Sequence, residues 1–484
     1  MSRLFGTDGI RGVANQWPLT ADFVLKMGQA AAQILRRDGD ARPAVVIGRD
    51  TRLSGYMLES ALAAGLTSQG VDVMLVGVIP TPGVAYLTRT HGAQLGIVIS
   101  ASHNPFDHNG IKIFGPGGFK IPGETEVEIE RLLLDSAQNP YGVLHPTKNS
   151  ERGVLGFSKK LFLGSDDEFG TAGAKMLGRS RVADEWRQDY VDHLIETWGE
   201  DSPLQGQRIL LDCANGATSQ IAPEVFRRLG FDAVVVENTP DGININEHYE
   251  YIYPEVLGAA VLREKALAGI AFDGDGDRVM MVDEKGGFIN GDVMLAILAR
   301  DMKTKGLLTN HAVVGTPMSN WGLKASLEEV DIRLEETAVG DRFVLQRMIE
   351  ENYTLGGEQS GHIITLRDGQ TTGDGIYTAL AVLKVAATEP NHSLAALAAC
   401  MREFPEYLVS IEVPSKPPLQ TIPEVQDALR RLHASLGENI DVTLRYSGTE
   451  SKLRLKIRAG EEHDPKDLER EAETFMAVAG QTIK

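Results

Sequence analysis

The chain has 484 residues, of which 42% are hydrophobic and 24% are charged, an ordinary composition for a globular protein with sizeable cores. At roughly 150 residues per domain, this length predicts about three domains and excludes a single small module. The formal net charge of −19 argues against nucleic-acid binding, which relies on clustered cations. It leaves room for a small anionic ligand held by a few local cations.

The sequence contains no recognisable targeting or membrane-spanning segment. Asp8 and the glycines around it stand where a secretory peptide would need an apolar run. Nowhere do about eighteen apolar residues run together. The two cysteines, Cys213 and Cys400, lack metal-ligand spacing and are too few for a disulfide framework, so we expect buried thiols. We therefore expect a cytoplasmic enzyme that does not associate with membranes.

Short β-branched runs alternate with helical patterns over most of the chain, which is typical of α/β sheets with parallel strands. In chain order, the first set comprises a strand at 44–47, a helix at 56–69 and strands at 71–76 and 95–100. The second comprises strands at 209–212, 233–236, 268–272 and 279–282, with helices at 219–229 and 254–266. The third comprises helices at 293–305 and 323–330, a helix starting at 343, and strands at 312–315 and 332–337.

The last eighty or so residues have a different pattern, with strands at 407–413, 442–446 and 453–457 and helices at 423–436 and 468–478. This order predicts an α+β domain on an antiparallel sheet. Residues 145–181 are polar and lack periodicity, so we expect an insertion there. The predicted fold is three tandem mixed α/β sheet domains, at 1–182, 183–289 and 290–403, followed by an α+β domain at 404–484.

The sharpest motif is Asp-Gly-Asp-Gly-Asp-Arg at 273–278, between two apolar strands. Side chains at alternate positions of an extended chain point the same way, so Asp273, Asp275 and Asp277 are expected to converge. Carboxylates held this close need a cation, and an incomplete cage of hard oxygen ligands suits Mg²⁺. A calcium loop fits less well, because it expects flanking helices. A plain polar turn is the other alternative.

Ser102 lies in Ser-Ala-Ser-His-Asn-Pro at 100–105, after a predicted strand. Loops at the carboxyl ends of parallel strands commonly carry the sites of α/β proteins. Ser102 and His103 could form a hydrolase pair, although adjacent residues rarely have that geometry and no G-x-S-x-G elbow is present. A structural turn serine is the alternative.

Cations occur in glycine-containing segments near predicted strand ends: Arg11, Arg49, Arg52 and Lys112. Each could be a solvated surface charge, but their shared placement favours an anion site. Two further loops suit ligands. Gly-Gly-Glu-Gln-Ser-Gly-His at 356–362 offers donors and acceptors for sugar hydroxyls, and Arg-Tyr-Ser-Gly-Thr-Glu at 445–450 could form an anion nest or an ordinary hairpin.

Taken together, these segments resemble the α-D-phosphohexomutase family. The motifs that carry the resemblance occur in the family's order: FGTDGIRG from Phe5, ISASHNPFDHNGIKIFG from Ile99, DGDGDR from Asp273, GGEQSGH from Gly356 and RYSGTE from Arg445. The resemblance covers the chain apart from the 145–181 segment. It implies four domains around one central cleft.

The resemblance also implies roles for individual residues. Ser102 resembles the serine that is phosphorylated in the active enzyme, and Asp273, Asp275 and Asp277 resemble the ligands that bind one Mg²⁺ together with Ser102, with Arg278 beside them. Around the transferring phosphoryl group the family uses Arg11, His103 and Lys112, the last for proton transfer. The residues expected to bind the sugar and its own phosphate are Glu358, Ser360, His362, Arg445, Ser447, Gly448 and Thr449.

The implied reaction moves a phosphate between two positions of a hexose through phosphoserine and a sugar 1,6-bisphosphate. Gln359 and the runs at 315–320 and 371–375 resemble the family's glucosamine branch, so the expected ligand is a hexosamine phosphate, on a monomer or homodimer. Mannose or glucose phosphates are the alternative substrates. A metal-dependent sugar phosphatase and a non-catalytic sugar-phosphate sensor are alternatives from other functional classes.

Overall fold

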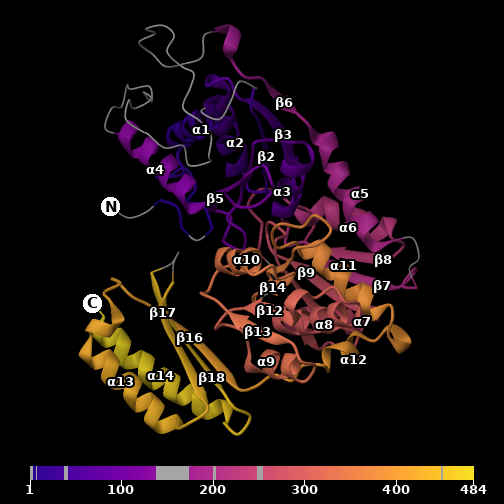
Figure 1. The fold of residues 1–484 in the computed structure, drawn as a ribbon, viewed down its shortest axis with the longest axis vertical. Coiled ribbons are helices and arrows are strands. Elements are labelled where there is room, and N and C mark those ends of the chain that lie inside the picture. Colours follow the sequence, from indigo (N-terminus) through magenta and orange to yellow (C-terminus); the bar gives the residue numbers. More distant parts are fainter. Residues whose placement is uncertain are drawn as a thin grey trace. The chain divides into compact units, whose positions relative to one another are not determined.

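The computed structural model describes residues 4–6, 8–36, 42–137, 174–199, 203–247, 254–447 and 451–483. The chain forms two compact units (Figure 1). The first comprises Met1–Phe288 and Ile364–Leu394, and the second comprises Ile289–Ile363 and Ala395–Lys484.

The first unit contains a six-stranded sheet that mixes parallel and antiparallel pairs. In sheet order its strands are β1 (Ile10–Val13), β5 (His108–Phe114), β4 (Leu95–Ile99), β2 (Ala44–Arg49), β3 (Asp72–Val78) and β6 (Ser180–Val182). Its helices are α1 (Ala21–Arg36), α2 (Ser54–Ser68), α3 (Thr81–Thr90) and α4 (Gly123–Ala137).

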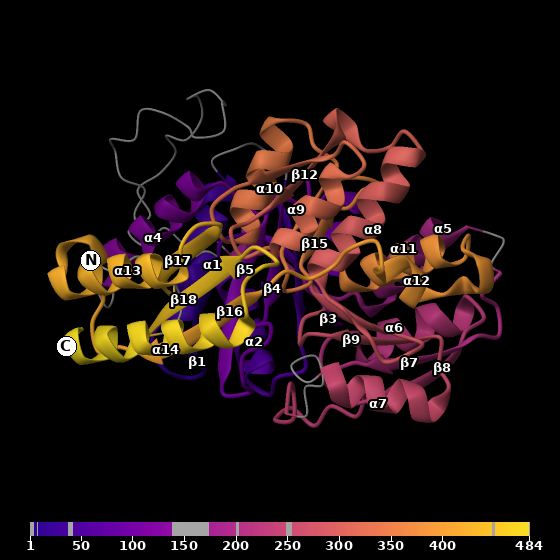
Figure 2. The same cartoon turned by 90° about the horizontal axis from the view of Figure 1, so that it is seen from below.

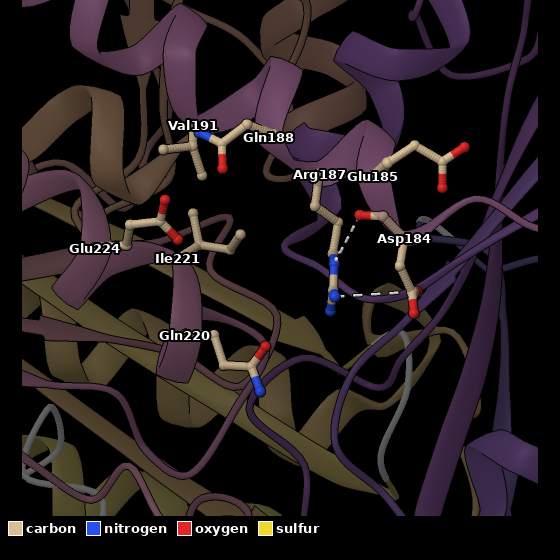
Figure 3. Close-up of a pocket in the computed structure, with 8 residues that line it drawn as sticks. All are labelled: Asp184, Glu185, Arg187, Gln188, Val191, Gln220, Ile221 and Glu224. Carbon is tan, nitrogen blue, oxygen red and sulfur yellow. Dashed lines mark hydrogen bonds and ion pairs between the residues drawn. The ribbon is translucent and has the colours of Figure 1, made fainter.

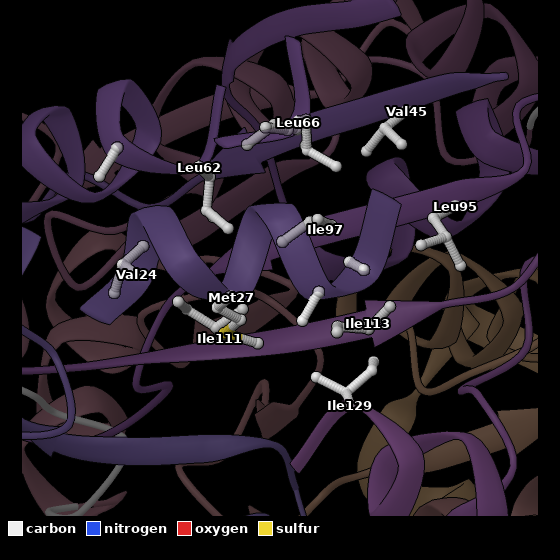
Figure 4. Packing of buried hydrophobic residues seen from close by; sticks show 14 of the residues in the cluster. Val24, Met27, Val45, Leu62, Leu66, Leu95, Ile97, Ile111, Ile113 and Ile129 are labelled. Atoms are coloured by element: carbon white, nitrogen blue, oxygen red, sulfur yellow. The ribbon is translucent and has the colours of Figure 1, made fainter. Parts of the chain in front are cut away.

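The two faces of this sheet are covered by different helices. Val45 and Ile47 alternate along β2 and lie in one apolar cluster with side chains of α1, α2 and α4 (Figure 4). Val46, between them, is equally buried but lies outside that cluster, and α3 packs against β2 and β4. Alternate side chains of a strand point to opposite faces of the sheet, and helices cover both faces of β2. Both sets of side chains are therefore apolar, which explains the continuous apolar run in the sequence.

A second mixed sheet of five strands completes the first unit. Its strands are β11 (Phe288–Ile289), β10 (Val279–Asp283), β9 (Ala268–Phe272), β7 (Arg208–Asp212) and β8 (Asp232–Val236). Its helices are α5 (Arg187–Trp198), α6 (Thr218–Arg228), α7 (Pro254–Glu264) and α11 (Gly375–Ala386). The late helix α11 packs against β9, β10 and α5.

The second unit has two sheets. The four-stranded sheet is β13 (Arg333–Glu336), β12 (Ala312–Gly315), β14 (Leu355–Gly357) and β15 (Ile363–Thr365), with α8 (Gly291–Thr304), α9 (Trp321–Glu328) and α10 (Asp341–Glu350). The short helix α12 (Leu394–Ala398) leads to an antiparallel sheet of β16 (Glu406–Glu412), β18 (Lys452–Ala459) and β17 (Ile440–Tyr446). Helices α13 (Pro423–Leu436) and α14 (Pro465–Thr482) cover one face of it (Figure 2).

The mixed α/β sheets and the final α+β sheet confirm the predicted fold class. The division at 182, 289 and 403 stays a prediction. Two expectations need correction. Most of the 145–181 segment lies outside the described residues, but its end begins β6, which pairs with β3. Cys213 is buried, whereas Cys400 is only half-buried, and both are free thiols.

None of the helices within the described ranges is both long enough and apolar enough to cross a membrane.

Helices α1 and α2 touch through glycine. A Cβ on Gly28 would lie 2.7 Å from the Leu62 carbonyl oxygen, and one on Gly65 would collide with the Leu25 carbonyl oxygen.

We therefore expect Gly65→Ala to lower the free energy of unfolding by about 1–3 kcal/mol through overpacking, although alanine itself favours a helix. Urea unfolding measures the effect, and Ala64→Ser on the exposed face of α2 is the control. Equal stability of the two variants would contradict this packing argument.

Candidate active site

Ser102 lies in the turn that follows β4, at the carboxyl end of that strand. The residue is 1% exposed, and its φ of +53° is left-handed, which costs a non-glycine residue about 1–2 kcal/mol. Its hydroxyl donates a hydrogen bond to Asp273 Oδ2 at 2.5 Å. His103 Nδ1 lies 3.5 Å from Ser102 Oγ, farther than the aspartate. The serine hydroxyl is therefore directed to the acidic turn, the segment that carries Asp273, Asp275 and Asp277. This geometry does not favour a serine–histidine hydrolase pair.

Asp273, Asp275 and Asp277 lie in the turn between the antiparallel strands β9 and β10. They do converge, with one ligand atom from each within 4.8 Å of the others. The reason differs from the expected alternation of an extended chain, because Gly276 has a φ of +69° and the segment is a turn. A Cβ at Gly274 would lie 2.5 Å from the Ser102 carbonyl oxygen, so glycine permits this close approach.

The acidic turn fits a hard divalent cation. Burial, together with the negative charges of Asp277 and Asp275, raises the pKa of Asp273 well above its usual range. Asp275 Oδ1 is buried and accepts no hydrogen bond from the part of the chain described, which is costly for a carboxylate oxygen without a cation. An oxygen-only donor set with room for further ligands suits Mg²⁺.

Lys112 lies within strand β5, and not near a strand end as the sequence pattern indicated. It is 1% exposed, and its Nζ lies 2.9 Å from Asp275 Oδ2, 3.0 Å from Asp277 Oδ2 and 3.0 Å from Asp8 Oδ2. Burial alone would lower the pKa of Lys112, but these three carboxylates outweigh it and raise the pKa well above its usual value. Lys112 is therefore an ammonium ion fixed at the edge of the acidic turn.

Asp8 is a member of the site that the sequence patterns did not single out. Its carboxylate lies 2.5 Å from Arg11 Nη2 and 2.6 Å from Lys120 Nζ, in addition to Lys112. Burial would raise the pKa of Asp8, but these cations lower it well below its usual range. Asp8 thus gathers cations beside the serine loop, the segment 100–107 between β4 and β5, where Arg11 Nη1 also donates to the Ala101 carbonyl at 3.3 Å.

Other contacts orient the acidic turn. Thr81, at the start of α3, donates from its hydroxyl to Asp275 Oδ2 at 2.6 Å and from its amide to the Asp275 carbonyl at 2.9 Å. The Arg278 amide donates to Asp273 Oδ1 at 3.2 Å, and Arg278 Nε lies 3.8 Å from Asp277 Oδ1. Desolvation and the charges of Arg278 and Arg11 lower the pKa of His103 to about 3. No local sequence signal marks Thr81.

In the second unit, the predicted sugar-binding loop joins β14 to β15. Glu358 Oε1 accepts a hydrogen bond from the Gly340 amide at 3.1 Å, and His362 Nε2 lies 3.7 Å from Asp341 Oδ2. Ser360 lies half-buried on the same loop. The Gln359 amide lies between two residues of the C-terminal sheet, donating to Glu406 Oε1 at 3.0 Å and accepting from Lys456 Nζ at 3.0 Å.

The predicted phosphate-binding loop begins at the end of β17. Arg445 pairs with Arg454 across the strands β17 and β18. Burial and the charge of Arg454 lower the pKa of Arg445, and the negative charge of Glu358 partly offsets this lowering. Paired arginines favour an anion between them. Ser447 is buried, and its carbonyl accepts from Lys416 Nζ at 2.7 Å, while Gly448 and Thr449 lie outside the described residues. Arg454 and Lys416 are cations that no motif indicated.

A separate pocket of about 200 Å³ lies in the first unit (Figure 3). It is lined by Asp184, Glu185, Arg187, Gln188, Val191, Gln220, Ile221 and Glu224. Its arginine is directed to Asp184, with Nε donating to the carbonyl of that residue at 3.3 Å. None of the predicted site residues lines it, so it is not the candidate active site.

The comparisons with known proteins agree on one family. Models of the phosphoglucomutase/phosphomannomutase family match residues 2–139 with domain I, 188–287 with domain II and 290–404 with domain III. A protein of Syntrophus aciditrophicus named phosphoglucosamine mutase is 45% identical over 457 residues, covering 94% of this chain and 95% of that protein. One of the same name from Bdellovibrio bacteriovorus is 43% identical over 479 residues, covering 98% of each chain.

Solved structures share the fold. A phosphoglucomutase/phosphomannomutase family protein of Burkholderia thailandensis superimposes with a TM-score of 0.76 at 23% identity, covering 99% of this chain and 98% of the other. An Aspergillus fumigatus N-acetylphosphoglucosamine mutase, solved with GlcNAc-6P and magnesium, superimposes with a TM-score of 0.61 at 15% identity, covering 100% and 96%.

If the acidic turn binds Mg²⁺, a few millimolar MgCl₂ raises the melting temperature of the wild type. A ligand at one hundred times its dissociation constant adds about 2.7 kcal/mol to stability. Asp275→Asn removes a ligand charge and is expected to abolish most of the Mg²⁺-dependent shift, whatever its own melting temperature. Glu255→Gln, on an exposed position of α7, is the control and keeps the full shift. An equal shift in all three proteins, measured by scanning calorimetry with and without EDTA, would contradict the assignment.

Proposed function

Because the chain belongs to the phosphohexomutase family, we propose that it is a phosphoglucosamine mutase, interconverting glucosamine 6-phosphate and glucosamine 1-phosphate. The observation that carries the proposal is the contact of 2.5 Å between Ser102 Oγ and Asp273 Oδ2, beside a buried ammonium group and two more carboxylates. A hydroxyl so placed can carry a phosphoryl group next to a metal ion.

In the proposed cycle, phospho-Ser102 gives its phosphoryl group to the free hydroxyl of the sugar. The bond from phosphorus to the serine oxygen breaks, a bond to the sugar oxygen forms, and the product is a sugar 1,6-bisphosphate. The bisphosphate then turns round, and its other phosphate returns to Ser102. The proton that the attacking sugar hydroxyl loses passes by way of Lys112 to the departing serine oxygen, so Lys112 is protonated before and after the step, and the proton returns by the same route in the second half-reaction. Transfer of this kind depends chiefly on positioning and on charge stabilisation.

Charge explains why the site needs several cations. A phosphoserine carries about −1.5 to −2, and the carboxylates of Asp273, Asp275 and Asp277 add further negative charge. One bound Mg²⁺ would be held by these carboxylates and by a Ser102 oxygen, and it would neutralise part of this charge and polarise the phosphoryl oxygens. Arg11, Lys112 and Arg278 balance most of the remainder, and His103, neutral next to these cations, can hydrogen-bond to the phosphoryl group.

The residues proposed to bind the sugar belong to the second unit. Glu358, Ser360 and His362 would bind hydroxyl or amino groups of the hexosamine, since carboxylate and imidazole groups pair with both. Arg445 and Ser447, with Gly448 and Thr449, would hold the phosphate that is not transferred. The pKa of Arg445, lowered by burial and by the charge of Arg454, supports this role, because a bound anion would stabilise the charged guanidinium that both effects disfavour.

Several finer points of the proposal rest on family membership alone. We propose one Mg²⁺ per chain and a sugar 1,6-bisphosphate that acts as both intermediate and activator. The small-molecule partner is then a hexosamine phosphate. A monomeric or homodimeric state, the absence of nucleic-acid and membrane partners, and a cytoplasmic location all stay predictions.

Ser102→Ala is expected to lower mutase turnover by about 10³-fold or more, because it removes the oxygen that carries the phosphoryl group. Ser60→Ala, at an exposed serine of α2, is the control and is expected to keep wild-type activity. Intact-mass analysis of the purified wild type should find one phosphate, and peptide mapping should locate it on Ser102. Turnover retained by Ser102→Ala would refute the phosphoserine cycle.

A comparison of three substrates tests the sugar. We expect kcat/KM for glucosamine 6-phosphate to exceed those for mannose 6-phosphate and glucose 6-phosphate by tenfold or more, because a site that hydrogen-bonds the amino group leaves polar atoms unpaired with the other sugars. Priming by a sugar bisphosphate and the absence of net phosphate release separate the mutase from a phosphatase. A preference for mannose or glucose phosphate would move the chain to a sibling activity.

A further inference from the structure

A buried arginine lies behind the serine loop and has no place in the machinery assigned above. Arg52 follows β2 in the segment that leads into α2, and it is 0% exposed. A fully buried guanidinium is costly unless every donor finds an acceptor. Its acceptors therefore show what the residue does.

The Arg52 guanidinium donates most of its hydrogen bonds to the loop that carries Ser102. Nη2 donates to the Ser102 carbonyl at 2.9 Å and to the Asn104 carbonyl at 2.7 Å. Nη1 donates to the His108 carbonyl at 3.0 Å and also to the Pro105 carbonyl. Nε donates to Asp50 Oδ2 at 2.7 Å. The five N–H donors of an arginine side chain are thus all engaged, with four of them on backbone carbonyls between residues 102 and 108.

Asp50 connects the arginine to the start of the same loop. Its carboxylate is 0% exposed and accepts from Ser100 Oγ at 2.7 Å as well as from Arg52. Ser100 Oγ in turn accepts from the Ser102 amide at 2.9 Å. The ion pair therefore reaches both backbone polar groups of Ser102, the amide through Ser100 and the carbonyl directly.

A second side chain binds two of the same carbonyls. Asn246 Nδ2 donates to the Ser102 carbonyl at 2.9 Å and to the Asn104 carbonyl at 3.0 Å. Two carbonyls thus each accept one donor from Arg52 and one from Asn246. This double support can hold Ser102 in its left-handed conformation, which a serine does not favour by itself.

We propose that Arg52, backed by Asp50, is a positioning residue that fixes the backbone of Ser102 so that its oxygen faces the acidic turn in both half-reactions. The inference rests on the proposed function, since it concerns the oxygen that would carry the phosphoryl group. Arg52 itself does not touch the reacting atoms. Lysine at this position would keep the charge but offers only three donors from one nitrogen, without the planar fork.

The test compares Arg52→Lys with Arg300→Lys. Arg300 is a half-buried arginine of α8 whose Nη2 also donates to a backbone carbonyl, that of Ser326 at 2.6 Å, and lies 2.8 Å from Glu329 Oε2, so Arg300→Lys is a matched loss of a guanidinium outside the serine loop. Asn246→Gly is the second variant. It removes the other support at a half-buried position and suits the φ of +60° there, so it keeps the test available if Arg52→Lys folds poorly.

Three quantities are measured for each variant: the melting temperature, kcat and KM for glucosamine 6-phosphate, and the single-turnover rate of phosphoryl transfer from enzyme primed with glucosamine 1,6-bisphosphate. We expect Arg52→Lys to lower kcat and the single-turnover rate about 100-fold, with KM within threefold of wild type, because misplacement of a reacting group by about 1 Å has an effect of that size. Asn246→Gly is expected to lower both rates by about tenfold, and Arg300→Lys to leave them within threefold.

A purely structural role predicts another result, in which the melting temperature falls while both rates of the folded enzyme stay within threefold of wild type. That result for Arg52→Lys and Asn246→Gly would overturn the inference. Ser102→Ala separates the two proposals. If it retains turnover, the phosphoserine function is wrong. If it is inactive while Arg52→Lys transfers normally, only the positioning role is wrong.

Discussion

The contacts of one buried ammonium group, that of Lys112, hold the first unit's site together. Carboxylates that converge in a low-dielectric site repel one another strongly, and Asp275 and Asp277 are tolerated side by side because Nζ lies about 3 Å from each. Lys112 lies on β5, an interior strand between β1 and β4, and it is 1% exposed. Asp8 then compensates the local excess of cations by binding Lys112, Arg11 and Lys120.

Sequence reasoning could find the features whose residues lie close together in the chain. Asp273, Asp275 and Asp277 occur within five residues, and Ser102 stands in a dense polar motif after an apolar strand. The apolar strands around them were recognisable because burial on both faces leaves a continuous run of β-branched residues. The order of strand and helix patterns in the last eighty or so residues likewise indicated an antiparallel sheet, which the structure contains.

What could not be predicted depends on pairing between distant segments. Strand β5 includes Asn109, Gly110 and Lys112, residues typical of a loop, and only its place inside a sheet makes it a strand. Asp8 and Thr81 lie far from the acidic turn in the sequence, and nothing near them marks a contact with Lys112 or Asp275. Arg49 and Arg52 are three residues apart with the same chemistry, yet only Arg52 reaches the serine loop. Such differences follow from tertiary geometry.

The side-chain amide of Gln359 has a consequence for how this protein can be recombined with its relatives. It belongs to the loop between β14 and β15 but binds Glu406 and Lys456 of the C-terminal sheet. The identity of residue 359 is therefore tied to two positions that lie outside its own sheet. A chimera that exchanges only the last eighty residues would break this trio unless the donor chain carries compatible partners, so the three positions have to be transplanted as a set.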